Sequence, residues 1–375
     1  MRLGIDASTQ LELDEAHPHY FYHGHEIEPW SFMHAHNGCD IMRLRVWNDP
    51  YDEEGRPYGG GTSSLERFIV LAKRALNCGY SLLMDFHYSD FWADPGKQNL
   101  PKAWRGLNYE ETVAALHDFT HDCLKRVKEE GIPLEAVQIG NEITNGICWP
   151  HGKLNGGGEG KIREGYDRLS GLLQAGVKAV REVYPEAKVV LHLEKSGAVE
   201  THDEWYTQIS KQGVDFDIIG LSYYPYWHGR LDRLEENIVN LSAKFHKPIW
   251  IVEAGYPFTD EPYDPEEAKK LFVSHADNEK QYISYEGDPL PYPYTAKGQK
   301  DYFEFLMGLL RRLNVEVLFY WEPFWVPSTH VGWAKAPGMR YEGQEVTRED
   351  LNEWANQCLF DYSGETTPAF DVFVK

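Results

Sequence analysis

Short apolar runs recur along the whole chain, and amphipathic segments separate them. Most runs are nearly continuous in apolar residues rather than alternating, which is typical of strands buried on both faces of a parallel sheet. Eight such runs predict strands, at residues 3–7, 41–47, 81–87, 136–140, 188–193, 216–223, 248–253 and 317–321.

The segments between the runs repeat their apolar residues at helical spacing. One opens with a capping box in the stretch 63–66 and stops at Gly79. A second runs from Asn108, with Glu111 three residues on, to Gly131. The same spacing predicts further helices near residues 169–183, 202–212, 231–245 and 298–313.

Strands that alternate with helices in this way predict an α/β fold, a single (β/α)8 TIM barrel whose long βα loops form an open substrate cleft. A doubly wound open sheet is the alternative. It lacks support, because the glycine-rich stretch at 156–158 does not have the G-x-G-x-x-G spacing. Since no linker, repeat or low-complexity segment interrupts the pattern, we expect one catalytic domain over residues 1–375.

Charge narrows the possible partners. The chain carries 59 acidic and 37 basic side chains, a formal net charge of −22. This excess argues against a nucleic-acid partner, which requires a basic surface, and against docking on anionic membrane. No apolar run reaches the roughly 18 residues that a membrane span requires. We expect neither a nucleic acid nor a membrane as partner, and we expect a monomer.

The N-terminus and the cysteines bear on location. Residues 1–6 contain no long apolar stretch and no small-residue cleavage site, so we expect a cytoplasmic protein if the chain is complete. The alternative is a secreted protein whose signal has been removed. The five cysteines, an odd number without a C-x-x-C pair, indicate neither a disulfide framework nor a zinc site, and they suit a reducing compartment.

In a (β/α)8 barrel the chemistry lies at the carboxyl ends of the strands, because the βα loops build the site there. Charged, amide and aromatic side chains stand at these positions. They are Arg45, Asp85, His87, Asn141, Glu142, Tyr223, Tyr224, Glu253, Trp321 and Glu322.

Two of these carboxylates, Glu142 and Glu253, follow apolar strand residues on nearly opposite strands. Cleavage of a glycosidic bond requires one carboxylic acid to protonate the departing oxygen and a second carboxylate across the bond. The pair therefore predicts a glycosidase. The alternative is structural, since a carboxylate at a strand end can also cap a helix or pair with arginine.

Long motifs at the same strand ends carry a resemblance to a known family. They are RLRVWNDP (43–50), DFHYSDFWADPGKQ (85–98), VQIGNEITNG (137–146), IIGLSYYPYWHG (218–229) and FYWEPFW (319–325). They resemble signatures of glycoside hydrolase family 53, the endo-β-1,4-galactanases of the barrel-fold clan A. The match spans the chain from GIDAST near its start to LFDYSGETTPAFDVF near its end.

The resemblance implies that Glu142 is the acid/base and Glu253 the nucleophile of a retaining mechanism with a galactosyl-enzyme intermediate. It also implies that Asn141 hydrogen-bonds the sugar 2-hydroxyl, and that His87 and Trp321 lie around the reacting sugar. The physics agrees, because an ionised Glu253 raises the pKa of Glu142 and keeps it protonated. His87 could instead be a core histidine.

Two further groups are expected to hold Glu253 ionised and oriented. They are Arg45 and one tyrosine from the end of the sixth strand, Tyr223 or Tyr224. Neighbouring residues point to opposite faces of a strand, so only one of the two tyrosines can face the site. Arg45 could instead pair with another carboxylate in the barrel.

Aromatic residues are numerous, with 12 Trp, 23 Tyr and 17 Phe. We expect Trp92, Trp227 and Trp325 to stack on sugar rings along the cleft, with core packing as the alternative for each. Asp90 and Asp94 either bind sugar hydroxyls or fix their own loop.

We expect no cofactor and no metal ligands. The histidines at 17–25 suggest a metal-dependent hydrolase, but they follow the first strand in a loop and lack partner ligands on other strands. Some bacterial family members bind calcium through the loop after strand seven. The corresponding stretch here, 274–279, lacks a dense run of acidic ligands, so calcium is possible but unsupported.

Together these features predict a retaining endo-β-1,4-galactanase that hydrolyses galactan or arabinogalactan side chains of pectin, or galacto-oligosaccharides. One alternative is the same mechanism on another β-1,4-glycan, such as mannan or glucan. Another is a non-catalytic glycan-binding barrel.

Overall fold

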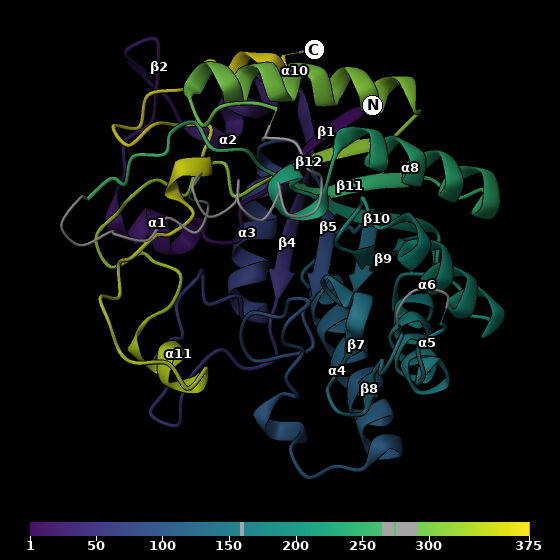
Figure 1. Cartoon of the computed structure of the whole chain (residues 1–375). Coiled ribbons are helices and arrows are strands. Elements are labelled where there is room, and N and C mark those ends of the chain that lie inside the picture. Colours follow the sequence, from purple (N-terminus) through teal and green to yellow (C-terminus); the bar gives the residue numbers. More distant parts are fainter. Residues whose placement is uncertain (158–160, 265–273, 275–290, 375) are drawn as a thin grey trace.

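A computed structural model describes residues 1–157, 161–264, 274 and 291–374. Eight parallel strands close into a barrel, with helices between consecutive strands (Figure 1). In barrel order the strands are β1 (Arg2–Asp6), β4 (Cys39–Val46), β5 (Ser81–Phe86), β6 (Ala136–Ile139), β9 (Lys188–Leu193), β10 (Ile218–Tyr223), β11 (Ile249–Ala254) and β12 (Val317–Trp321). The predicted fold class is confirmed, and the predicted strand bounds differ from these by no more than two residues at either end.

The barrel interior changes from apolar to charged along the strands. Side chains two residues apart share one face of a strand, so Ile41 is followed inside by Arg43 and Arg45. Apolar interior residues of neighbouring strands form one buried cluster that includes Ile41 and Leu83. Towards the carboxyl ends the same faces carry ionisable groups, Asp85 after Leu83 among them. A packed floor therefore supports a polar layer.

In the part of the chain that the structure describes, six long helices cover the barrel. They are α3 (Leu65–Asn77), α4 (Tyr109–Glu129), α5 (Tyr166–Val183), α6 (Val199–Lys211), α8 (Leu231–Phe245) and α10 (Ala296–Arg312). The predicted start of α4 at Asn108 is confirmed, and a capping box forms there, because the side chains of Asn108 and Glu111 each accept a hydrogen bond from the other's backbone N–H.

The predicted capping box of α3 is wrong by one residue. Ser64 is the N-cap, and its hydroxyl accepts a hydrogen bond from the backbone N–H of Arg67. Glu66 therefore lies one position too early to bond back to the cap. Two serines stand side by side at this helix start, and the spacing to an acidic residue selected the wrong one.

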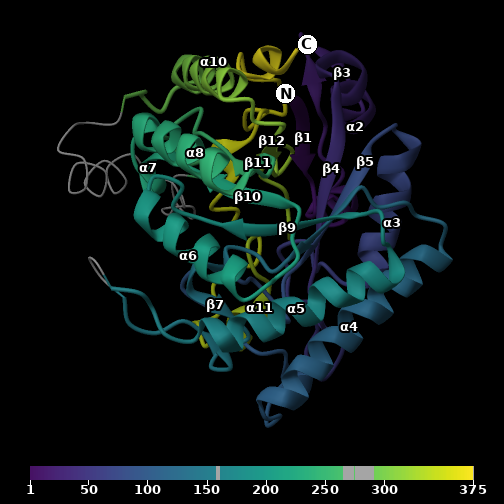
Figure 2. The ribbon, with the colours of Figure 1, turned by 90° about the vertical axis from the view of Figure 1, so that its right-hand side faces the viewer.

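Shorter elements decorate the two ends of the barrel. They are α1 (Gln10–Ala16), β2 (Phe21–Tyr22), β3 (His25–Glu26), α2 (Pro29–Phe32), β7 (Gly146–Ile147), β8 (Gly152–Lys153), α7 (Pro225–His228) and α11 (Ala336–Tyr341). Figures 1 and 2 show both chain termini at one end, and β7 and α11 towards the other. Among the described residues, no helix has the length and apolarity needed to cross a bilayer.

Candidate active site

A cleft of about 390 Å³ opens at the carboxyl ends of the strands. It brings together nine of the side chains that the sequence singles out. They are His87, Trp92, Asp94, Asn141, Glu142, Tyr224, Trp227, Glu253 and Trp321. Three other predicted residues, Arg45, Tyr223 and Trp325, do not line it.

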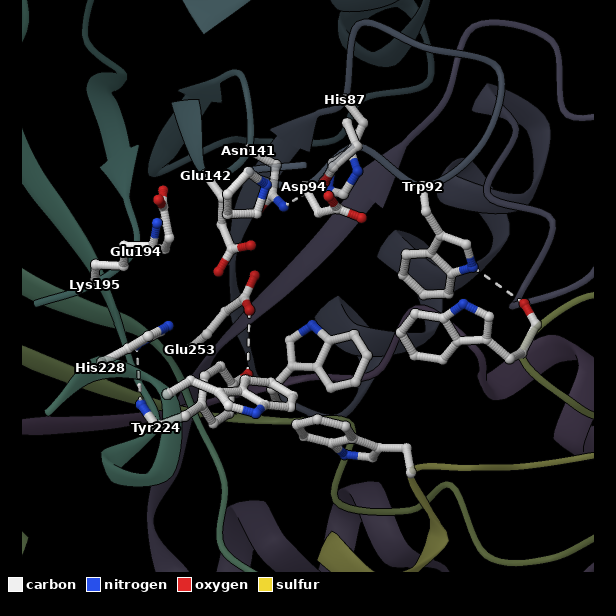
Figure 3. A pocket seen from close by; sticks show the side chains of 16 residues that line it. His87, Trp92, Asp94, Asn141, Glu142, Glu194, Lys195, Tyr224, His228 and Glu253 are labelled. Atoms are coloured by element: carbon white, nitrogen blue, oxygen red, sulfur yellow. Dashed lines mark hydrogen bonds between the residues drawn. The ribbon is translucent and has the colours of Figure 1, made fainter. Parts of the chain in front are cut away.

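Glu142 follows β6 in a strained backbone. Its φ of 50° and ψ of 55° are left-handed, a conformation that costs roughly 1–2 kcal/mol for a residue other than glycine. Gly140 before it has a φ of 83°, and a 3₁₀ turn, Ile143–Asn145, follows directly. This turn directs the carboxyl into the cleft, where Glu142 and Glu253 point toward one another (Figure 3).

A hydrogen-bonded chain positions the carboxyl of Glu142. The hydroxyl of Ser222 donates to its Oε1 at 2.8 Å. His192 Nε2 lies 2.7 Å from the same hydroxyl oxygen, and burial keeps the pKa of this histidine well below its ordinary value. Ser222 is also the register partner of Glu253 on the neighbouring strand β11, so the residue that bonds Glu142 is adjacent in the sheet to Glu253.

Glu253 is 7% exposed and is held by a cation and a phenol. Arg43 Nη1 lies 2.8 Å from its Oε1, and the hydroxyl of Tyr224 donates to its Oε2 at 3.1 Å. Burial raises the pKa of Tyr224 well above its ordinary value, so the phenol remains a donor at neutral pH.

Arg43 is fully buried and uses all five of its N–H donors. Two side-chain amide oxygens accept from it, those of Gln138 at 3.2 Å and Asn141 at 2.7 Å. Three carboxylates pair with it, those of Asp6, Asp85 and Glu253, each at 2.8 Å. Burial opposes the positive charge, but the three carboxylates hold the pKa of Arg43 above its ordinary value.

The two facing carboxyls have different proton affinities. Burial raises the pKa of Glu142 well above its ordinary range, and the nearby charges of Glu253 and Glu194 raise it further. Burial also raises the pKa of Glu253, to about 7, while the Arg43 guanidinium opposes this rise. The pair therefore holds its last proton on Glu142, and Glu253 is the one that ionises first.

The expected role of Arg45 is wrong. Arg45 Nη1 pairs with Glu322 at 2.8 Å, and its guanidinium lies over the Trp92 ring, 4.4 Å from the centroid. Arg43, two residues earlier on the same face of β4, makes the contact to Glu253 instead. Arg45 supports an aromatic wall of the cleft.

The two candidate tyrosines have different positions: one faces the cleft and the other is buried. Tyr224 faces the cleft and bonds Glu253, as described above. Tyr223 is fully buried and donates to the backbone carbonyl of Gly229 at 2.9 Å, so it supports the loop that follows β10. Its inclusion among the site residues is a wrong prediction.

Asn141 and His87 lie beside the two carboxyls. The amide of Asn141 donates to the carbonyl of Ala93 at 3.0 Å, and its oxygen accepts from Arg43. His87 Nε2 lies 2.9 Å from Asp85, while its Nδ1 is buried without a hydrogen-bond partner among the described residues. Burial lowers the pKa of His87, so the ring is neutral at neutral pH.

The two aspartates of the β5–α4 loop differ. Asp94 lines the cleft, although its Oδ1 also accepts from the backbone N–H groups of Gly96 and Lys97. Asp90 is fully buried and accepts from the backbone of Asp49 and Lys102, so it fixes the loop.

Tryptophans form one wall of the cleft. Trp92 and Trp333 are stacked, with centroids 4.3 Å apart, and Trp321 meets Trp354 edge-on at 4.6 Å. Trp333 and Trp354 come from the long segment after β12, where no sequence pattern marked them as site residues. Trp325 is fully buried behind Trp333, with centroids 5.8 Å apart, so its predicted role in stacking on sugar is wrong.

The cleft also contains Glu194, Lys195 and His228, which the sequence analysis missed. Glu194 follows β9 with the same alternation as Val190 and His192, and this spacing was the signal available in the sequence. The apolar run ended before Glu194, and no motif marked it.

Where the structure describes the chain, the acidic, histidine and cysteine side chains do not gather into a metal site. Among the described residues, no group of three or more histidine, cysteine or acidic side chains is arranged to hold a metal ion. The stretch 274–279, which bears on calcium, lies outside the described residues apart from residue 274.

The chain is similar in sequence and structure to known proteins. The model of glycosyl hydrolase family 53 matches residues 2–373. The "Uncharacterized protein in bgaB 5'region" of Niallia circulans is 35% identical, over 99% of this chain and 92% of its own. The endo-beta-1,4-galactanase of Bacillus subtilis (strain 168) is 30% identical, over 99% and 84%. The solved Ignisphaera aggregans GH53 catalytic domain superposes with a TM-score of 0.84 and 35% identity, over 99% and 94%.

Proposed function

Because the chain belongs to glycosyl hydrolase family 53 and is therefore a glycoside hydrolase, we propose that it is a retaining endo-β-1,4-galactanase. The substrate would be β-1,4-galactan or arabinogalactan of the kind found as pectin side chains. The relative named endo-beta-1,4-galactanase supports the choice of linkage and sugar.

One observation carries the proposal: two carboxyl groups face each other across the cleft, and Glu253 alone of the two is paired with the buried Arg43. Such an asymmetric pair suits general acid catalysis by Glu142 and nucleophilic attack by Glu253. Tryptophan faces beside the pair suit stacking on sugar rings.

In the first step, an oxygen of Glu253 bonds to the anomeric carbon of the sugar above it. The bond from that carbon to the glycosidic oxygen breaks, and the proton of Glu142 moves to the departing oxygen. Arg43 and Tyr224 orient the attacking carboxylate. The negative charge of Glu253 disappears on forming the ester, so the pKa of Glu142 falls.

In the second step, the ionised Glu142 takes a proton from water, and the water oxygen bonds to the anomeric carbon. The ester bond to Glu253 breaks, and both carboxyls return to their starting states. Two inversions leave a β-configured product. Neither step uses a metal, so we propose that no cofactor is required and that a chelator leaves the chemistry unchanged.

Azide tests the two roles separately, with a 2,4-dinitrophenyl β-galactobioside as substrate. In Glu142→Ala, the activated substrate still forms the glycosyl-enzyme, and azide converts it to the β-glycosyl azide. In Glu253→Ala, azide takes the place of the missing carboxylate and gives the α-glycosyl azide. The opposite pairing of products would overturn the assignment of roles.

Product analysis tests the substrate. The unmodified protein should release oligosaccharides from debranched pectic galactan, first as β-anomers by NMR. Faster release from mannan or carboxymethyl-cellulose than from galactan would overturn the proposed specificity.

A further inference from the structure

A third carboxyl group lies in the cleft, and the mechanism above does not use it. Glu194 follows β9 and shares the barrel-facing side of that strand with Val190 and His192. Its side chain is 1% exposed and lines the cleft.

One oxygen of Glu194 accepts a hydrogen bond from a side chain of the protein. The hydroxyl of Thr144 donates to Oε2 at 2.6 Å. Oε1 is buried and has no hydrogen-bond partner among the described residues. A buried carboxyl oxygen without a partner is destabilising, so such an atom in a binding cleft indicates a place for a ligand's donor.

The position of Glu194 relative to the catalytic pair selects one half of the cleft. Thr144 belongs to the 3₁₀ turn that follows Glu142, so its bond ties Glu194 to the flank of the acid. Figure 3 shows Glu194 and Lys195 on one side of the two carboxyls and Trp92 on the other.

The two sides of the catalytic pair bind different sugars of the substrate. The nucleophile bonds to the sugar that is retained, whereas the acid protonates the oxygen of the sugar that leaves. The flank next to Glu142 therefore receives the leaving sugar.

Lys195 adds a donor beside this acceptor. It is exposed, lines the cleft, and has a left-handed φ of 57°. Its loop is fixed at Ser196, whose hydroxyl bonds the carbonyl of Ser222, and at Gly197, whose N–H donates to the carbonyl of His228 at 3.0 Å. A carboxyl oxygen and an ammonium side by side match sugar hydroxyls, which both donate and accept.

We propose that Glu194, assisted by Lys195, binds the galactose of the leaving group: Oε1 accepts a hydrogen bond from one of its hydroxyls. This rests on the proposed galactanase function. Glu194 then binds the sugar that leaves during hydrolysis. It also binds an acceptor sugar when the glycosyl group is transferred in the reverse direction.

The test compares two substrates that differ only in the leaving group. Galactotetraose places a galactose on the Glu142 flank, whereas 2,4-dinitrophenyl β-galactobioside places an aryl group there. For Glu194→Ala we expect kcat/KM on the tetraose to fall about 10- to 100-fold, as loss of a hydrogen bond to a charged group implies. On the aryl substrate it should stay within about 3-fold.

Matched variants separate binding from structure and charge. Glu194→Gln keeps an oxygen and an N–H of the same reach but removes the charge that raises the pKa of Glu142. It should therefore lose less kcat/KM on the tetraose than Glu194→Ala does, and the alkaline limb of its pH profile should lie at lower pH. Lys195→Ala should show a smaller loss, again on the tetraose alone. If the alanine variant fails to fold, Glu194→Asp withdraws the oxygen by one methylene and should show the same selective loss.

An equal fall on both substrates, or a Glu194→Gln variant as impaired as the alanine variant, would overturn the proposal. So would unchanged hydrolysis of the tetraose by Glu194→Ala. If the parent protein hydrolyses neither substrate, the proposed function itself fails, and this outcome is distinct from the others.

Discussion

Arg43 and Arg45 show how small a displacement separates two roles. Both face the barrel interior from one strand, two residues apart, yet one contacts Glu253 and the other Glu322. The alternation of the strand predicts that both point inward. It does not predict which of them lies level with Glu253, because that depends on the stagger between strands on opposite sides of the barrel.

Replacement of Arg43 by lysine tests its role directly. The guanidinium lowers the pKa of Glu253, so its loss should raise that pKa and move the acidic limb of the pH–activity profile to higher pH. Misplacement of the nucleophile should also lower kcat/KM on galactan about 10²-fold. Initial rates between pH 4 and 9 measure both effects.

Arg45→Lys is the matched control for this variant. It removes the same guanidinium geometry from the same face of β4 without touching Glu253, so its acidic limb should coincide with that of the parent. Coincident acidic limbs for all three proteins would contradict the role given to Arg43.

Ser222 should control the opposite limb of the profile. The parent activity should rise through pH 7 as Glu253 ionises, and it should fall at higher pH as Glu142 loses its proton. The Ser222 hydroxyl bonds Glu142 and lowers its pKa, so Ser222→Ala should move the alkaline limb upward. The measurement is kcat/KM against pH up to 10; an alkaline limb that moved downward would count against the assignment.

At the scale of elements, the strands were predictable and the long loops were not. Each strand is a run of apolar residues buried on both faces, and this pattern is local in the sequence. Trp333 and Trp354 reach the cleft from a segment without periodic spacing, where tertiary packing alone decides which face of a ring is exposed.

The start of α3 gives a stability prediction at this scale. Ser64 caps the helix, so Ser64→Ala should lower the free energy of unfolding by about 1 kcal/mol. Ser63 is buried, and its hydroxyl has no partner among the described residues, so Ser63→Ala should change it by less than about 0.5 kcal/mol. Urea unfolding of the two variants compares them; a larger loss for Ser63→Ala would restore the sequence-based capping box.

At the scale of the whole molecule, the barrel and the catalytic pair were predictable because closure of eight strands brings their carboxyl ends together. The effect of the net charge of −22 on substrate capture depends on the charge of the substrate. A neutral galactan is neither attracted nor repelled by an acidic protein, so long-range steering contributes nothing to its capture.

Salt therefore provides a prediction for the whole molecule. Between 0.02 and 0.5 M NaCl, kcat/KM on galactan should change by less than about twofold, because only screened, long-range charge effects vary over this range. Rates on debranched galactan at constant pH measure it. A rate that rises steeply with salt would indicate a charged substrate, such as a galacturonan, whose repulsion is being screened.

The left-handed backbone of Glu142 has an evolutionary consequence. Glycine occupies that conformation without steric cost, so at this position the residue that best serves folding is not the one that serves hydrolysis. Repeated selection for heat resistance alone would drive the codon towards glycine and would yield a sturdier barrel that no longer cuts polysaccharide.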